Sequence, residues 1–150
     1  MIGLSGGPEV HALLDRMCNQ ADRLREVLIC SPFVDEALDE RLAKLATAIT
    51  SAGARLLLIT TPEVARPLRL LLAGQEYRRT TVSTPRRRLH AKAYVSVARR
   101  ARESEAIITS ANLTKAGLAS NIELGVRVVP VSDAGRLLFD QTCRFVRALA

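Results

Sequence analysis

The sequence has no tryptophan, and only 3% of its 150 residues are aromatic. Exposed aromatic platforms that bind bases or insert into lipid are therefore not expected. No apolar run approaches the roughly 18 residues that a membrane-spanning helix needs, and the run at 56–59 is typical of those present. Residues 1–16 have neither the basic start nor the apolar stretch of a secretory signal peptide. We therefore expect a cytoplasmic protein without a membrane span.

Cysteine and histidine are also scarce. Cys18, Cys30 and Cys143 are odd in number and each lies among apolar residues, which indicates buried thiols in a reducing compartment. The chain has only two histidines, His11 and His90, and no acidic cluster lies near His90 in the sequence. No convincing set of metal ligands results, so we predict neither a metal site nor a cofactor.

Positive charge is abundant but unevenly distributed. The chain has 22 lysines and arginines against 15 acidic residues, a net charge of +7. Residues 1–76 carry a net charge of −2, and residues 77–150 carry +9. This asymmetry favours an anionic partner for the second half, either nucleic acid or an anionic lipid headgroup. The alternative is a solvated arginine face without a partner.

The composition, 48% hydrophobic and 25% charged, is typical of one globular domain spanning 1–150. In the first half, the residue pattern predicts helices over about 9–24 and 37–49, buried strands at 27–30 and 55–60, and a helix after Thr61 that kinks or breaks at Pro67. In the second half, it predicts strands at 77–83, 88–97, 106–110 and 122–129, and helices at 115–119 and 133–149. We expect an α/β fold with a mixed, mostly parallel sheet flanked by helices on both faces.

His90 and Lys92 have the same parity within the strictly alternating segment 88–97. On a strand, their side chains would project from one face, about 6–7 Å apart. An imidazole beside a fixed ammonium is suited to an incoming phosphate. A histidine and a lysine two residues apart also occur incidentally on strands, so the pair by itself is weak evidence.

Two further polar groups occur near strand ends. Ser110 and Asn112 follow an apolar strand and could donate hydrogen bonds to phosphoryl oxygens. The alternative is that Asn112 or Thr114 caps the short helix that follows. Glu123 lies among apolar residues of a predicted strand, where a buried carboxylate needs a partner. Either His90 or Arg127 could fill that role.

In combination, His90-x-Lys92, Ser110-x-Asn112 and Asn121-x-Glu123-Leu124-Gly125 resemble the phospholipase D superfamily, particularly its small dimeric bacterial nucleases with a single HKD-type motif. Residues 31–35, SPFVD, are similar to the segment after the first strand of that fold. The chain departs from the family pattern at Val97, where an aspartate is usual, and at Thr109, where a glycine is usual.

The resemblance implies a metal-independent phosphodiesterase in which one histidine attacks phosphorus and a second protonates the leaving oxygen. Because this chain has one motif copy, it implies a homodimer in which each subunit contributes its His90 to a shared site. Lys92 and Asn112 would hold the non-bridging oxygens with help from Ser110, and Glu123 would orient His90.

The arginines favour nucleic acid, DNA or RNA, as the substrate. Arg86, Arg87 and Arg88 precede His90 directly, Lys115 follows the second motif, and Arg78, Arg79, Arg99, Arg100 and Arg102 come from neighbouring connections. An endonuclease is the leading hypothesis. A lipid phosphodiesterase or transphosphatidylase, and a catalytically degenerate nucleic-acid-binding module, remain open, and so does an unidentified partner protein.

Overall fold

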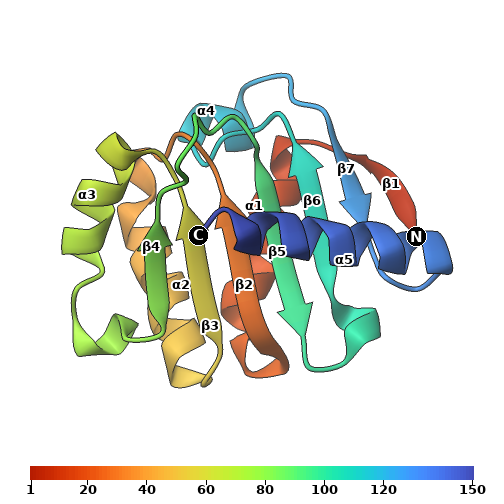
Figure 1. The fold of residues 1–150 in the computed structure, drawn as a ribbon, viewed down its shortest axis with the longest axis horizontal. Coiled ribbons are helices and arrows are strands. Elements are labelled where there is room, and N and C mark those ends of the chain that lie inside the picture. Colours follow the sequence, from red (N-terminus) through yellow and green to blue (C-terminus); the bar gives the residue numbers. More distant parts are fainter.

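The computed structural model describes residues 1–150 and contains seven strands and five α-helices (Figure 1). The strands are β1 (Ile2–Ser5), β2 (Leu24–Cys30), β3 (Arg55–Ile59), β4 (Thr80–Ser83), β5 (Ala93–Ala98), β6 (Glu105–Thr109) and β7 (Gly125–Val128). The helices are α1 (Gly7–Asn19), α2 (Asp39–Ser51), α3 (Pro62–Leu71), α4 (Lys115–Ala119) and α5 (Asp133–Ala148).

All seven strands form one sheet in the order β1-β7-β6-β5-β2-β3-β4. Five strands run in one direction, and only β5 and β7 oppose them. Parallel neighbours nevertheless occur only at β2–β3 and β3–β4, and the other four pairings are antiparallel. The mixed α/β architecture expected from the sequence is therefore confirmed, although most of its ladders are antiparallel.

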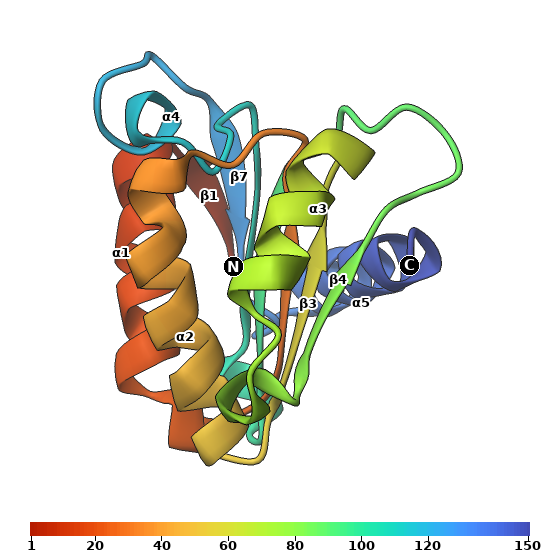
Figure 2. The same cartoon turned by 90° about the vertical axis from the view of Figure 1, so that its left-hand side faces the viewer.

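Helices cover both faces of the sheet, as expected. Figure 2 shows α1, α2 and α4 on one face and α5 alone on the other. Two apolar clusters fill the spaces between these layers, one of 22 buried residues on the α1/α2 side and one of 12 on the α5 side. Every residue of β5 is buried, because the strand lies centrally and is covered on both sides.

Three elements differ from the predictions at the N-terminal end. β1 was not predicted, because it is only four residues long, contains Gly3 and pairs with β7 at the sheet edge. The helix predicted over 9–24 ends at Asn19, a 3₁₀ turn follows at Ala21–Arg23, and β2 already begins at Leu24. Ala21 and Leu24 are buried, and their spacing continues the apolar pattern of α1, so the sequence resembles that of a longer helix.

Pro67 lies inside α3, and the helix continues through it to Leu71, so of the kink or break expected there the break is wrong. Cys30 and Cys143 are buried as predicted, whereas Cys18 is partly exposed. No helix combines the length and the apolar character needed to cross a lipid bilayer.

Candidate active site

His90 and Lys92 lie in the segment that joins β4 to β5, not on a strand as predicted, because β5 begins only at Ala93. The reason is topological. β4 and β5 are separated in the sheet by β3 and β2, so residues 84–92 must cross the upper edge of the sheet in Figure 1. His90 is exposed at the end of this crossing and Lys92 is half-buried.

Lys92 connects the crossing segment to the neighbouring strand. Its carbonyl accepts a hydrogen bond from the Thr109 amide at 3.1 Å, and its Nζ donates to the His90 carbonyl at 3.2 Å. The ammonium is thereby held beside the backbone of His90. The motifs His90-x-Lys92 and Ser110-x-Asn112, about twenty residues apart in the sequence, thus meet at one edge of the sheet.

Glu123 lies in an exposed loop before β7, not in a buried strand, and its neighbours Ile122 and Leu124 point into solvent. The Ser110 hydroxyl donates to its Oε2, and Asn121 Nδ2 donates to its Oε1 at 3.2 Å. Neither His90 nor Arg127 is a hydrogen-bond partner of Glu123 in this chain. Arg127 instead pairs with Glu105 at 2.6 Å.

Asn112 is half-buried in the loop after β6, and its Oδ1 is a buried acceptor with no hydrogen-bond partner. Thr114 caps α4, because its Oγ1 accepts a hydrogen bond from the Gly117 amide at 3.0 Å. The capping interpretation therefore holds for Thr114 and not for Asn112. A buried acceptor without a partner is unusual, and only the Nδ2 group of Asn112 could donate to a phosphoryl oxygen.

The loop that carries Asn112 is held in place by residues that the sequence analysis did not assign to the site. Tyr94 on β5 donates its hydroxyl hydrogen to the Ala111 carbonyl at 3.0 Å, and burial raises the pKa of this phenol. Ser31 Oγ accepts from the Leu113 amide at 2.9 Å. Asp35 Oδ2 accepts from the Lys115 amide at 2.7 Å. The SPFVD segment thus braces the loop, and its position after β2 was the only sequence signal for this role.

The two departures from the family pattern have different structural contexts. Val97 is buried in the apolar cluster near the far end of β5, whereas the site lies at the other end of the strand, before Ala93. Thr109 Oγ1 donates to the Leu124 carbonyl at 3.2 Å and accepts from the Ala111 amide at 3.1 Å. Its side chain therefore links the two loops that carry Ser110 and Glu123.

His90 lies between two cavities. One, of about 540 Å³, is bounded by Lys92, Thr109 and Ser110 together with Phe145 of α5. The other, of about 550 Å³, lies toward α3 and is lined by Pro32, Phe33, the start of α3, and Arg86, Arg87 and Arg88. His90 lines both cavities, and we call the two together the groove.

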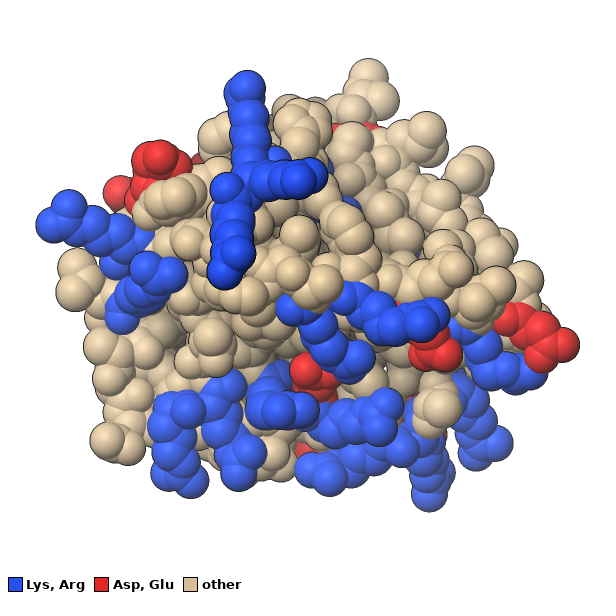
Figure 3. All heavy atoms as spheres, in the orientation of Figure 1, with Lys and Arg blue, Asp and Glu red and all other residues tan.

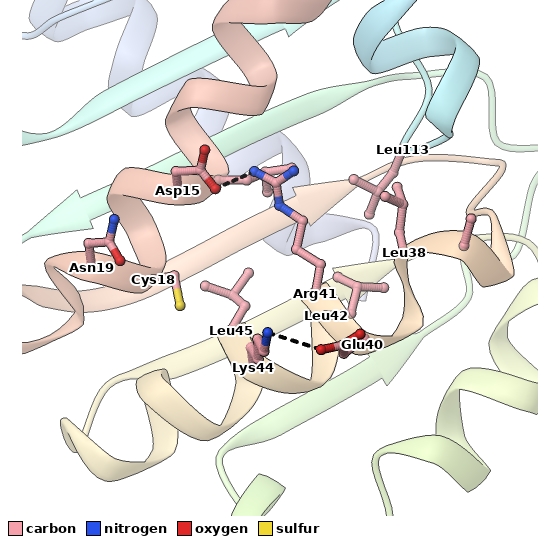
Figure 4. A pocket seen from close by; sticks show the side chains of 12 residues that line it. Asp15, Cys18, Asn19, Leu38, Glu40, Arg41, Leu42, Lys44, Leu45 and Leu113 are labelled. Atoms are coloured by element: carbon pink, nitrogen blue, oxygen red, sulfur yellow. Dashed lines mark hydrogen bonds and ion pairs between the residues drawn. The ribbon is translucent and has the colours of Figure 1, made fainter.

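His11 does not belong to this groove. It lies on α1, where its Nε2 is 2.9 Å from Arg41 and 3.6 Å from Asp15. Asp15 and Arg41 also line a separate cavity of about 510 Å³ between α1 and α2 (Figure 4). The chain therefore brings one histidine, not two, to the candidate active site.

The remaining arginines do not surround His90 as the sequence analysis assumed. Arg78 and Arg79 precede β4, and Arg99, Arg100 and Arg102 follow β5, so all five lie at the opposite end of the sheet from the groove. Strand direction decides this, because β4 runs toward the site edge and β5 runs away from it. No group of three or more histidine, cysteine, aspartate or glutamate side chains is arranged to hold a metal ion.

Comparison with solved structures identifies the fold. NucT from Helicobacter pylori superposes with a TM-score of 0.64 at 15% identity, covering 99% of this chain and 94% of that one. The phospholipase D family member Nuc from Salmonella typhimurium gives a TM-score of 0.58 at 13% identity, covering 94% and 90%. This chain has a phospholipase D-like fold.

A polyphosphate kinase from Porphyromonas gingivalis also matches, with a TM-score of 0.60 at 16% identity over 91% of this chain. The match covers only 20% of the kinase chain, which is therefore a much larger protein. No family model and no curated protein sequence matches the chain. The similarity is therefore one of fold. At that level, the resemblance to the phospholipase D superfamily that the motifs predicted is confirmed.

Proposed function

We propose that the protein is a metal-independent phosphodiesterase that cleaves nucleic acid through a phosphohistidine intermediate at a site shared by two subunits. One observation carries the proposal. Within a phospholipase D-like fold, His90, Lys92 and Ser110 border one cavity, and Glu123 is hydrogen-bonded to Ser110. These are the residue types that contact phosphate in the superfamily.

The proposed reaction has two steps. In the first, a ring nitrogen of one His90 attacks phosphorus, the P–N bond forms, and the P–O bond to the leaving group breaks while the second subunit's imidazolium protonates that oxygen. In the second, the same imidazole removes a proton from water, and the resulting hydroxide attacks phosphorus and displaces His90. Each histidine thus returns to its starting protonation state.

The other residues stabilise charge on the phosphoryl group. Lys92 and Asn112 donate hydrogen bonds to the non-bridging oxygens, where negative charge develops. Ser110 adds a hydroxyl beside them. Glu123 holds Ser110 and, once the shared site is assembled, fixes the tautomer of His90.

An apolar surface beside His90 supports the dimer. Ile108 and Phe145 line the His90 cavity and are both exposed, the latter at 52%. Leu4 lies in the same cross-strand row as Ile108, through Val126, on the α5 face of the sheet. Leu124 and Leu137 are also exposed. A patch of this kind next to an incomplete site fits contact with a second copy.

The arginines beside the groove support a nucleic-acid substrate. Arg86, Arg87 and Arg88 line the cavity next to His90, and none of them forms an ion pair with an acidic residue. Lys115, at the start of α4, is exposed at the same edge of the sheet. Phosphates that flank the cleaved one would meet these side chains.

The test is cleavage of labelled DNA and RNA oligonucleotides by the pure protein in EDTA, beside the His90→Ala variant. The chain's other histidine supplies a matched control, because His11→Ala removes an imidazole far from the groove. We expect the protein and His11→Ala to cut and His90→Ala to be inactive with an unchanged circular dichroism spectrum.

Activity that is lost on chelation and restored by a divalent ion would overturn the mechanism. Full activity of His90→Ala would overturn the site. Release of headgroup from phospholipid vesicles, with oligonucleotides left intact, would favour the lipid alternative. Binding of oligonucleotides without turnover would favour the degenerate binding module.

A further inference from the structure

The end of the sheet opposite His90 carries a second concentration of positive charge, which we call the arginine edge. Its members come from five separate segments of the chain and include no lysine. They are Arg23, Arg25, Arg55, Arg78, Arg79, Arg99, Arg100, Arg102 and Arg147. Figure 3 shows basic side chains gathered along the lower border of this face, below the strand ends that carry these residues in Figure 1.

Backbone contacts place these segments side by side. The Arg99 amide donates to the Arg23 carbonyl at 2.8 Å, and the Arg79 carbonyl accepts from the Leu56 amide at 2.9 Å. Arg55 and Arg147 both reach Glu26 on β2, the former at 4.0 Å. The strand-end arginines therefore form one row across β5, β2, β3 and β4, and Arg147 of α5 reaches that row through Glu26.

Acidic residues compensate only part of this charge. Glu26 binds Arg55 and Arg147, and Glu103 lies 3.7 Å from Arg100. The guanidinium of Arg99 donates only to backbone carbonyl oxygens, which are neutral and do not compensate its positive charge. Five members make no side-chain hydrogen bond or ion pair: Arg23, Arg25, Arg78, Arg79 and Arg102. The two other carboxylates of these segments, Asp22 and Glu76, have no arginine partner.

We propose that the arginine edge is a second binding surface for the phosphate backbone of a nucleic acid, separate from the groove at His90. Unpaired like charges held together are unfavourable in the free protein, and a polyanion that releases counterions relieves this repulsion. Guanidinium groups match phosphate because they form paired hydrogen bonds, which a lysine ammonium does not.

The dimensions of the row suit a duplex. Its four strands are separated by three gaps of about 4.8 Å, so the row spans roughly 14 Å before its long side chains are counted. Double-stranded nucleic acid presents about one charge per 1.7 Å of axis, which places roughly eight phosphates over that length.

A membrane surface fits less well. None of the large apolar side chains that are exposed on this protein lies at the strand ends that form the arginine edge; Phe145, on α5 with Arg147, lines the cavity at His90 instead. Peripheral membrane binding at this edge would therefore rest on charge alone, without apolar insertion. An extended chain of phosphates needs no such insertion.

The arginine edge and His90 lie at opposite ends of β5. Six-residue β5 separates the two surfaces, a distance of roughly 20 Å at about 3.4 Å per residue. Nucleic acid bound at the arginine edge is thus not the segment positioned for cleavage in the same subunit. The protein would hold a second segment, or a second molecule, while the groove acts on the first.

The experiment compares two triple variants with the same net charge. Arg78→Gln, Arg79→Gln and Arg102→Gln remove three unpaired members of the arginine edge. Lys44→Gln, Arg66→Gln and Arg136→Gln remove three exposed charges from α2, α3 and α5, so both proteins fall from +7 to +4. Binding of a fluorescent 20-base-pair duplex is followed by anisotropy at several salt concentrations, and both variants also carry His90→Ala so that the duplex stays intact.

We expect the edge variant to bind at least about ten-fold more weakly than the control variant, with a salt dependence lower by about two to three counterions. Equal affinities and equal salt slopes for the two variants would overturn the proposal. So would edge-dependent binding to phosphatidylserine vesicles with no edge-dependent binding to the duplex. Cleavage activity in the proteins that retain His90 is measured separately, so either hypothesis can fail while the other stands.

Discussion

Ser110 donates its hydroxyl hydrogen to the Glu123 carboxylate, and the Leu124 amide donates to the same hydroxyl oxygen at 3.1 Å. The Ser110 amide also donates to the Leu124 carbonyl at 2.9 Å. These contacts fasten the end of β6 to the loop before β7. The second and third motifs of the sequence thus act as one structural unit beside His90.

Glu123→Gln tests whether that unit serves the reaction through charge. Glutamine keeps the size of the side chain and can still accept a hydrogen bond from Ser110, but it cannot stabilise an imidazolium. We expect the cleavage rate to fall about a hundred-fold, with a shift of the pH–rate profile, while the melting temperature changes little. Glu40→Gln, at an exposed carboxylate of α2, should leave both measurements unchanged. An unaltered pH–rate profile would restrict Glu123 to a structural role.

Tyr94→Phe tests the brace beneath the Asn112 loop. The substitution removes the hydroxyl that donates to Ala111 and leaves a buried carbonyl without that partner. We expect the free energy of unfolding to fall by about 1–2 kcal/mol, and the cleavage rate to fall because Asn112 loses its fixed position. Tyr77→Phe is the control, since the only other tyrosine of the chain makes no side-chain hydrogen bond. Equal stability of the two variants in urea unfolding would contradict the role of Tyr94.

Much of this arrangement could be predicted from the sequence, because its determinants are local. Short apolar runs predicted β2, β3 and β6. Apolar residues at helical spacing predicted α2 and α5, because these residues form the buried faces of the two helices. The motif residues were found from their types and spacing, although His90, Lys92 and Glu123 lie in connections before strands and not on them. Their order along the chain was enough to suggest the phospholipase D-like fold.

The remainder depended on topology, which a single sequence does not reveal. The alternation around His90 resembled a strand, but the chain there must cross two other strands before it enters the sheet. The arginines after β5 lie near His90 in sequence, yet β5 carries them to the opposite edge. Tyr94 appeared only as a residue of an apolar strand, and its contact with Ala111 depends on a loop seventeen residues away.

Alkaline pH should destabilise the protein through two thiols. Burial raises the pKa of Cys30 and of Cys143 to about 11, from an ordinary value of 9.0. The unfolded chain therefore loses these protons first, so their stabilising contribution is complete below about pH 9 and is lost as pH rises through about 11. From pH 8 to pH 10, we expect a loss of about 1 kcal/mol per thiol in the free energy of unfolding.

Urea titrations of a Cys30→Ala and Cys143→Ala double variant measure this contribution. The double variant should lose less stability than the natural chain over the same pH interval, because alanine cannot ionise. Cys18→Ala should behave like the natural chain, since that thiol is partly exposed. Identical pH dependence in all three proteins would show that the buried thiols do not contribute.

The shared site gives the strictest prediction, because one chain supplies only one histidine to the groove. Phe145→Glu places a charge in the apolar surface beside His90, where Phe145 is half exposed and lines the cavity. We expect this variant to sediment as a folded monomer and to lose cleavage activity, although His90 and Lys92 are intact. Leu70→Glu, at an exposed leucine of α3, should remain dimeric and active. An active monomer would contradict a site built from two subunits.

Mixing subunits tests the same point without changing the interface. When the natural chain and His90→Ala are unfolded together in equal amounts and refolded, random pairing leaves about one quarter of the dimers with both histidines. Activity per natural chain should then fall to about half of that of the natural protein refolded alone. If each chain held a complete site, the activity per natural chain would not change, because pairing with an inactive copy would leave that site untouched.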